Sequence, residues 1–136
     1  MNKLGVHALV WVGGWSHDEC ERAIAQTAEL GFDLIEIPAL DPASIDAAFT
    51  RKMLDRYKLG TTLSLGLDAS TDISSGDPDK LARGEARLMQ VLAVAREIGA
   101  THVCGILYSA FQKYFEPPSE AGSLKSAVVR CVGERL

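Results

Sequence analysis

The sequence predicts an α/β fold made of about four βα units whose strands run parallel. Three stretches share one pattern, in which the end of a helix is followed by a glycine and then by a short apolar strand: residues 30–40, 57–65 and 97–106. These junctions lie roughly 30 to 40 residues apart, which is typical of repeated βα units. Four such units correspond to half of an eightfold barrel, or to a small open parallel sheet.

Glu36 is a carboxylate within the most apolar of these strands, residues 32–37, where a charged side chain is unusual. Gly31 ends the preceding helix, because glycine adopts a left-handed backbone without steric cost. The strand that follows is short and mostly apolar, which is typical of a strand buried on both faces. A buried charge costs several kcal/mol unless it is paired. We therefore expect Glu36 either to have a partner in the folded protein or to face a water-filled cavity.

The chain of 136 residues fits one domain with one core, residues 1–136. Its net charge of −4 opposes a nucleic-acid or anionic-membrane partner, since both usually require a basic surface. There is no run of about 20 apolar residues to span a membrane, and the first residues lack the apolar region of a secretory signal. The scattered cysteines indicate reduced, partly buried thiols in a cytoplasmic protein rather than a metal or catalytic site: Cys20, Cys104 and Cys131.

The first βα unit begins with a strand expected at residues 4–11 and a loop at 12–15. A helix follows from Ser16, because Ser16 and Glu19 have the spacing of a capping box. This helix is expected to end at Gly31 and to bury one stripe of residues: Ala23, Ile24 and Thr27.

The second unit has its strand at residues 32–39 and a helix that ends near Gly60. Asp41 and Pro42 fit the start of this helix, with Asp41 as the cap and Pro42 in the first turn, where its missing N–H is harmless. Its apolar residues recur at helical spacing: Ile45, Ala48, Phe49 and Met53.

The third unit has its strand at residues 61–67 and then a polar loop, 68–76, that is longer than a simple connection needs. Asp77 and Pro78 repeat the cap-and-proline start of a helix. Gly84 within this helix predicts close packing against a neighbour. The expected inner face of the helix consists of Leu81, Leu88, Leu92, Ala95 and Ile98.

The fourth unit has its strand at residues 101–108, followed by a loop that carries Phe111, Tyr114 and Phe115. Three aromatic residues beside the end of a strand predict either the wall of a pocket or a lid packed over it. A last helix is expected from Gly122, with an inner face of Val128, Val129 and Val132.

In parallel α/β folds the ligand lies at the carboxyl ends of the strands, which here include Glu36, residues 64–68 and residues 106–111. Alternation along the first strand places His7, Leu9 and Trp11 on one face. His7 and Glu36 then point inward from adjacent strands. They form either a structural hydrogen bond or two contacts to a polar ligand. The histidines and carboxylates show no recognised metal-ligand spacing, and no serine or cysteine lies in a nucleophile motif.

Several stretches together resemble the sugar isomerase/epimerase family of xylose-isomerase-like TIM barrels. These are residues 3–7, Trp11, Trp15, and residues 31–36, 65–67, 72–75 and 105–111. The resemblance is greatest to the ketose 3-epimerases that act on D-tagatose, D-psicose or L-ribulose, and it extends over the whole chain in order and spacing. It implies that the fold is the first half of a TIM barrel.

The resemblance implies an enzyme that uses a divalent metal, usually Mn²⁺, and two glutamates that move a proton at C3 through an enediolate. In this family the metal ligands and both catalytic glutamates lie on later strands, so no catalytic residue or metal ligand is assigned to this chain. Glu36 does not match either catalytic glutamate. By position, five residues are expected to form the substrate wall: His7, Trp15, Ser64, Ile106 and Phe111.

Two functions therefore compete: a ketose epimerase whose activity needs the second half of the barrel, and a non-catalytic half-barrel binding or interaction module that is inactive alone. A half barrel has two open sheet edges and a bare inner face, which predicts either a homo-oligomer or association with the missing second half. A DNA-repair endonuclease of the same superfamily is opposed by the acidic charge.

Overall fold

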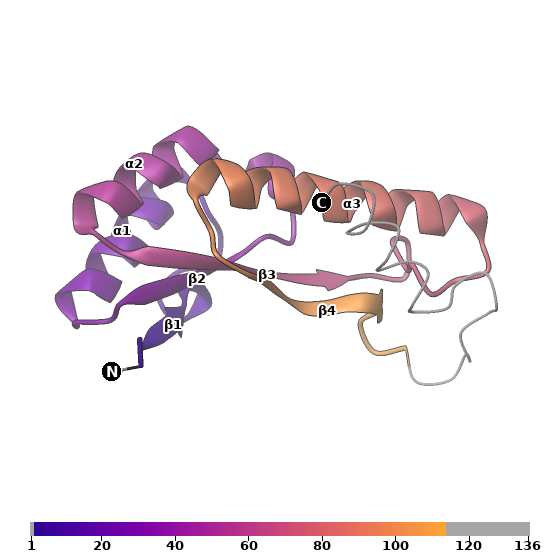
Figure 1. Ribbon diagram of the computed structural model, residues 1–136, viewed down its shortest axis with the longest axis horizontal. Coiled ribbons are helices and arrows are strands. Elements are labelled where there is room, and N and C mark those ends of the chain that lie inside the picture. The colour runs from indigo at the N-terminus through magenta and orange to yellow at the C-terminus, as the bar shows by residue number, and fades with distance from the viewer. Residues whose placement is uncertain (1, 114–136) are drawn as a thin grey trace. The chain divides into compact units, whose positions relative to one another are not determined.

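The computed structural model describes residues 2–113, which Figure 1 shows as strands alternating with helices. The strands of this part are β1 (Gly5–His7), β2 (Leu34–Pro38), β3 (Gly60–Leu67) and β4 (Val103–Ala110). They form one sheet in the order β1-β2-β3-β4, and β2 pairs with β1 and β3 in parallel. This confirms the predicted parallel α/β fold of about four βα units. Tyr114, Phe115, Cys131 and the expected last helix lie outside the described residues.

Three α-helices connect these strands: α1 (His17–Glu29), α2 (Ala47–Tyr57) and α3 (Pro78–Ile98). No helix among residues 2–113 has the length and apolar character needed to cross a membrane. The described chain divides into two compact units. The first unit contains residues 2–64 and 91–104, and the second contains residues 65–90 and 105–113.

In the first unit, α1 begins as the sequence predicts. Ser16 and Glu19 form the capping box, and Gly31 follows the helix with a φ of 78°. The predicted stripe of Ala23, Ile24 and Thr27 is buried. Figure 1 shows α1 and α2 on the same side of β1 and β2.

The faces of β2 differ in burial. Ile35 and Ile37 are fully buried, whereas Leu34, Glu36 and Pro38 alternate with them and are partly exposed. The expectation that this strand is buried on both faces is therefore wrong for the described chain. Only the face that carries the isoleucines is closed, so the other face remains open to a ligand.

The first strand is shorter than predicted. β1 ends at His7, and a 3₁₀ turn, Ala8–Val10, replaces the expected continuation to Trp11. The His7 side chain caps this turn, because its Nδ1 accepts a hydrogen bond from the Leu9 backbone N–H at 3.2 Å. His7, Leu9 and Trp11 consequently do not share one face of a strand.

The second helix begins later than predicted. Asp41 makes no capping hydrogen bond and precedes a short 3₁₀ turn, Pro42–Ser44, whereas Asp46 caps α2 by accepting from the Phe49 N–H at 2.9 Å. At the other end Lys58, with a φ of 56°, takes the left-handed position expected of a glycine, and Gly60 already belongs to β3.

In the second unit, α3 begins at Pro78 as predicted, and Gly84 is buried against the loop that precedes it. A Cβ at Gly84 would overlap the Thr71 carbonyl oxygen and lie 2.5 Å from Ile73 Cγ2, so the predicted close packing is confirmed. The predicted inner face is wrong at one position, because Leu92 is 40% exposed. The neighbouring Val91, which belongs to the first unit, is fully buried instead.

Candidate functional site

A pocket of about 250 Å³ lies on the open face of the sheet in the first unit. Its lining alternates along β2 with the buried Ile35 and Ile37, so it belongs to the opposite face of the strand. The lining residues come from β1, β2 and β3: Gly5, Val6, His7, Leu34, Glu36 and Thr62.

Parallel pairing places these residues in two levels. At the lower level Gly5 and Gly60 pair with Leu34 from either side. A Cβ at Gly5 would lie 3.1 Å from Leu34 Cβ, and one at Gly60 would lie 2.5 Å from Leu34 Cδ2. The two glycines thus make room for one leucine, in the alternation of small and large residues that fills a barrel interior. At the next level His7 pairs with Glu36, and Glu36 pairs with Thr62.

We call His7, Glu36, Thr62 and Ser64 the polar row. Ser64 follows Thr62 on the same face of β3, since alternate residues share a face. His7 Nε2 lies 2.9 Å from Ser64 Oγ and 3.7 Å from Glu36 Oε1. The structure therefore brings His7 together with two other residues singled out in the sequence.

The hydrogen bonds of His7 define its tautomer. Because Nδ1 accepts from the Leu9 N–H, a neutral His7 carries its proton on Nε2 and donates it to Ser64 Oγ. A serine activated as a nucleophile needs the reverse arrangement, in which the imidazole accepts the hydroxyl proton. In this arrangement His7 does not accept the Ser64 proton, so the pair is not arranged to activate Ser64 as a nucleophile.

Glu36 has partners and also faces the pocket, so both conditions stated for it are met. Its Oε2 accepts hydrogen bonds from Thr62 Oγ1 at 3.3 Å and Cys104 Sγ at 3.0 Å. Cys104 is exposed, so the expectation of a partly buried thiol is wrong for this residue. The hydrogen bond to Glu36, with some loss of hydration and the negative charge of Glu36, raises the pKa of the Cys104 thiol to about 11. The carboxylate is only partly buried, with 32% of its side chain exposed, which reduces the desolvation cost assumed from the sequence.

The other expected wall residues lie elsewhere. Trp15 is 9% exposed, and its indole N–H donates to Thr50 Oγ1 of α2 at 3.0 Å. Ile106 lies on β4 and Phe111 directly after it, both in the second unit, and Phe111 is 59% exposed. The roles of these three residues in substrate binding remain predictions.

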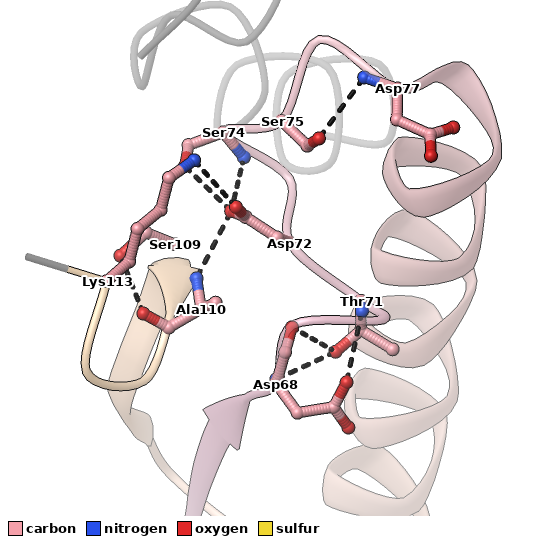
Figure 2. A network of polar contacts seen from close by, with 9 residues as sticks. All are labelled: Asp68, Thr71, Asp72, Ser74, Ser75, Asp77, Ser109, Ala110 and Lys113. Atoms are coloured by element: carbon pink, nitrogen blue, oxygen red, sulfur yellow. Dashed lines mark hydrogen bonds and ion pairs between the residues drawn. The ribbon is translucent and has the colours of Figure 1, made fainter. Parts of the chain in front are cut away.

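Sequence reasoning missed Thr62 and Cys104 as neighbours of Glu36. Both could be found only from the register of the parallel strands, which depends on residues far apart in the chain. It also missed Asp72 and Lys113, which form a buried ion pair of 2.7 Å in the second unit. Asp72 had two signals in the sequence, the unusual length of the polar loop at 68–76 and the resemblance over residues 72–75, but neither indicated its partner Lys113 (Figure 2).

The chain is similar to known sugar epimerases. No protein-family model matches the chain. The ketose 3-epimerase of Arthrobacter globiformis is 41% identical over 134 residues, which are 98% of this chain and 46% of that protein. The L-ribulose 3-epimerase of Methylomonas sp. (strain DH-1) is 43% identical over 122 residues, which are 90% of this chain and 43% of that protein. Along nearly its whole length the chain is therefore similar to sugar 3-epimerases, as the resemblance expected from the sequence.

Solved structures of sugar 3-epimerases contain the same fold. D-allulose 3-epimerase from Methylomonas sp., in complex with D-allulose, matches with a TM-score of 0.88 and 40% identity over 96% of this chain and 47% of its own. An L-ribulose 3-epimerase matches with a TM-score of 0.89 and 36% identity over 98% of this chain and 46% of its own. The chain spans about half the length of the curated relatives it matches.

The divalent metal implied for such epimerases has no fitting set of ligands in the described part of the chain. Among residues 2–113, no group of three His, Cys, Asp or Glu side chains is placed to hold a metal ion. The polar row offers one imidazole, one carboxylate and two hydroxyl groups. We therefore derive no chemical step through a metal held by these residues.

Proposed function

We propose that this chain forms one wall of the sugar site of a ketose 3-epimerase and that the polar row contacts the hydroxyl groups of the ketose. The main support is that His7, Glu36 and Thr62 line an open pocket on three parallel strands, with Ser64 hydrogen-bonded to His7. The relatives that match along nearly the whole chain are named ketose or L-ribulose 3-epimerases.

The chemistry of the polar row suits a sugar. Each ketose hydroxyl can donate and accept a hydrogen bond, and the row offers both acceptors and donors at neighbouring positions. Glu36 accepts, while Thr62 and Ser64 can do either. His7 donates to Ser64, which leaves the Ser64 hydrogen available for another acceptor such as a sugar hydroxyl.

In this proposal the chemical step belongs to residues outside 2–113. Epimerisation at C3 requires removal of a proton beside the carbonyl and its return to the other face. The resemblance assigns this to two glutamates and a divalent metal, usually Mn²⁺. We also propose that residues 1–136 form a single domain and that the protein is cytoplasmic. Its open sheet edges would be covered either by self-association or by pairing with a second half barrel.

The test is a chimera in which residues 1–136 replace the matching segment of the Arthrobacter globiformis enzyme. Chromatography of the products formed from D-allulose and L-ribulose with Mn²⁺ measures turnover. We expect turnover by the chimera and none by the 136-residue chain alone. Ser64→Ala in the chimera should raise KM about 3- to 10-fold, since one hydrogen bond to the sugar is lost.

Each other outcome has a defined meaning. Turnover by the isolated chain would refute the assignment of the chemistry to other residues. A folded chimera that binds ketose without converting it would favour the binding module, and one that binds no ketose would refute the sugar site. The wild-type Arthrobacter globiformis enzyme, assayed in parallel, controls for the assay.

A further inference from the structure

The carboxylate of Glu36 is held by only one of its two oxygens. Oε2 accepts hydrogen bonds from Thr62 Oγ1 at 3.3 Å and from Cys104 Sγ at 3.0 Å. Oε1 accepts none from the residues that the structure describes, because His7 Nε2 is 3.7 Å away and donates to Ser64 instead. One oxygen of Glu36 therefore has its partners within the sheet, whereas the other can still accept a hydrogen bond.

Cys104 donates to Glu36 from a segment that is paired with β3 in the first unit. The Leu63 N–H donates to the His102 carbonyl at 2.9 Å, two residues before Cys104. The Leu63 carbonyl oxygen lies 3.4 Å from the Cys104 sulfur, but the carboxylate is the nearer acceptor and it is charged, so it takes the single thiol hydrogen. The pKa of about 11 keeps this thiol protonated, and so able to donate, at neutral pH.

The hydrogen bond from Cys104 adds little to the stability of the fold. A thiol is a weak donor, and Cys104 is exposed, so water can replace either partner at little net cost. The acceptor, however, is a residue that lines the pocket. A glutamate side chain with several rotatable bonds loses conformational entropy when a ligand immobilises it. Two donors on Oε2 restrict the carboxylate before any ligand binds, which favours binding more than it favours folding.

We propose that Cys104 is a positioning residue, which donates to Oε2 of Glu36 and so holds the carboxylate in place for Oε1 to accept a hydrogen bond from a hydroxyl group of the ketose. The inference rests on the proposed function, because it needs a ketose in the pocket. Cys104 is not among the residues that line the pocket, and it does not touch the ligand. Its effect on binding is transmitted through Glu36.

The first experiment measures the hydrogen bond itself, by infrared spectroscopy of the S–H stretching band in the 136-residue chain. Subtracting the spectrum of Cys104→Ala from that of the wild type isolates the band of this thiol from those of the other cysteines. Donation to a carboxylate lowers the stretching frequency, so the band should move to higher frequency in Glu36→Ala. It should not move in His102→Ala, the matched control, because the His102 ring is hydrogen-bonded to the neighbouring Thr101.

The second experiment measures KM and kcat for D-allulose in the chimera. Cys104→Ala should raise KM about 3- to 5-fold and leave kcat within about 2-fold, because the ligand must then immobilise the carboxylate. Cys104→Ser, which restores a donor, should recover most of this loss. In a Glu36→Ala background, Cys104→Ala should change KM by less than about 1.5-fold, since the residue through which it acts is absent. His102→Ala again serves as the control.

The outcomes separate this inference from the function on which it rests. If the wild-type chimera binds no ketose, the proposed function fails and the role of Cys104 in binding fails with it. If the wild-type chimera is active, an unchanged KM in Cys104→Ala overturns the inference alone. The same holds for an equal rise in KM with and without Glu36, for a loss in Cys104→Ser as large as that in Cys104→Ala, or for an unmoved S–H band in Glu36→Ala. Should Cys104→Ala fail to fold, Cys104→Val, which suits a strand and also lacks a donor, gives the same comparison.

Discussion

Replacing Glu36 by glutamine should make Cys104 more reactive. The Cys104 thiol donates to Glu36 Oε2 at 3.0 Å, and this hydrogen bond is the largest cause of its raised pKa of about 11. Glutamine keeps the size of the side chain and an oxygen that can accept, but it removes the negative charge that opposes thiolate formation. The pKa of Cys104 should therefore fall toward its usual value of 9.0.

The size of the effect follows from the fraction of thiolate. At pH 8 a thiol with a pKa of about 11 is ionised in about 1 molecule in 1,000, and a thiol with a pKa of 9.0 in about 1 in 10. This gain of about 100-fold is reduced about 8-fold, because a thiolate of lower pKa is a weaker nucleophile. Burial still opposes ionisation in the variant, so we expect alkylation about 3- to 10-fold faster.

The assay is alkylation by iodoacetamide at pH 8, followed by mass spectrometry of the peptide that contains Cys104. Cys20 is an internal control, because burial raises the pKa of its thiol to about 11 and its hydrogen-bond partner is Thr50. Thr62→Val is the matched variant, since it removes another hydrogen bond to Glu36 but leaves the charge. An unchanged Cys104 rate in Glu36→Gln, or an equal rise in Thr62→Val, would refute the electrostatic argument.

Two further predictions concern stability. Gly84→Ala should lower the free energy of unfolding by about 1–2 kcal/mol, because overlap with a backbone oxygen outweighs the gain of about 1 kcal/mol in helix propensity. Chemical denaturation measures the free energy of unfolding. Gly66→Ala is the control, since a Cβ at Gly66 meets nothing within 4 Å. An equal loss of stability in Gly84→Ala and Gly66→Ala would contradict the packing argument. Hydrogen bonds from the Phe49 N–H and from His17 hold the pKa of Asp46 below its usual value of 3.8. The stability that this carboxylate adds is therefore present above about pH 4, and it is lost as the pH falls further and the carboxylate is protonated. Asp46→Asn keeps the helix cap and should flatten this acid limb in thermal unfolding from pH 2 to 6; an unchanged limb would contradict it.

Local signals predicted those parts of the fold that depend on a few adjacent residues. The capping box at Ser16 is complete within four positions, and the left-handed Gly31 needs no distant partner, so both were found in the sequence. Prediction failed where two nearby residues can do the same task. Asp46 caps α2 although Asp41 is followed by a proline, and Lys58 takes the left-handed position although Gly60 lies two residues further on.

The candidate site was predicted less completely than the fold, because its neighbours are defined by strand register. His7 and Glu36 were singled out by their polarity in apolar surroundings, and the structure pairs them across β1 and β2. Thr62 and Cys104 carry no such signal, since threonine is common in strands and a single cysteine is ambiguous. Their approach to Glu36 depends on how β3 and β4 align with β2, which no local pattern specifies.

The two levels of the pocket have different chemistry, since the lower level is apolar and the upper level is polar. Leu34 between Gly5 and Gly60 forms an apolar floor in which each glycine leaves space for the leucine. The polar row begins one level closer to the carboxyl ends of the strands, which is where parallel barrels bind their ligands. Because β1, β2 and β3 run in one direction, each of them supplies a residue of the floor before a residue of the polar row. A substitution that fills the floor should therefore change the stability of the sheet, whereas under the proposed function a change in the polar row should change which sugars are bound.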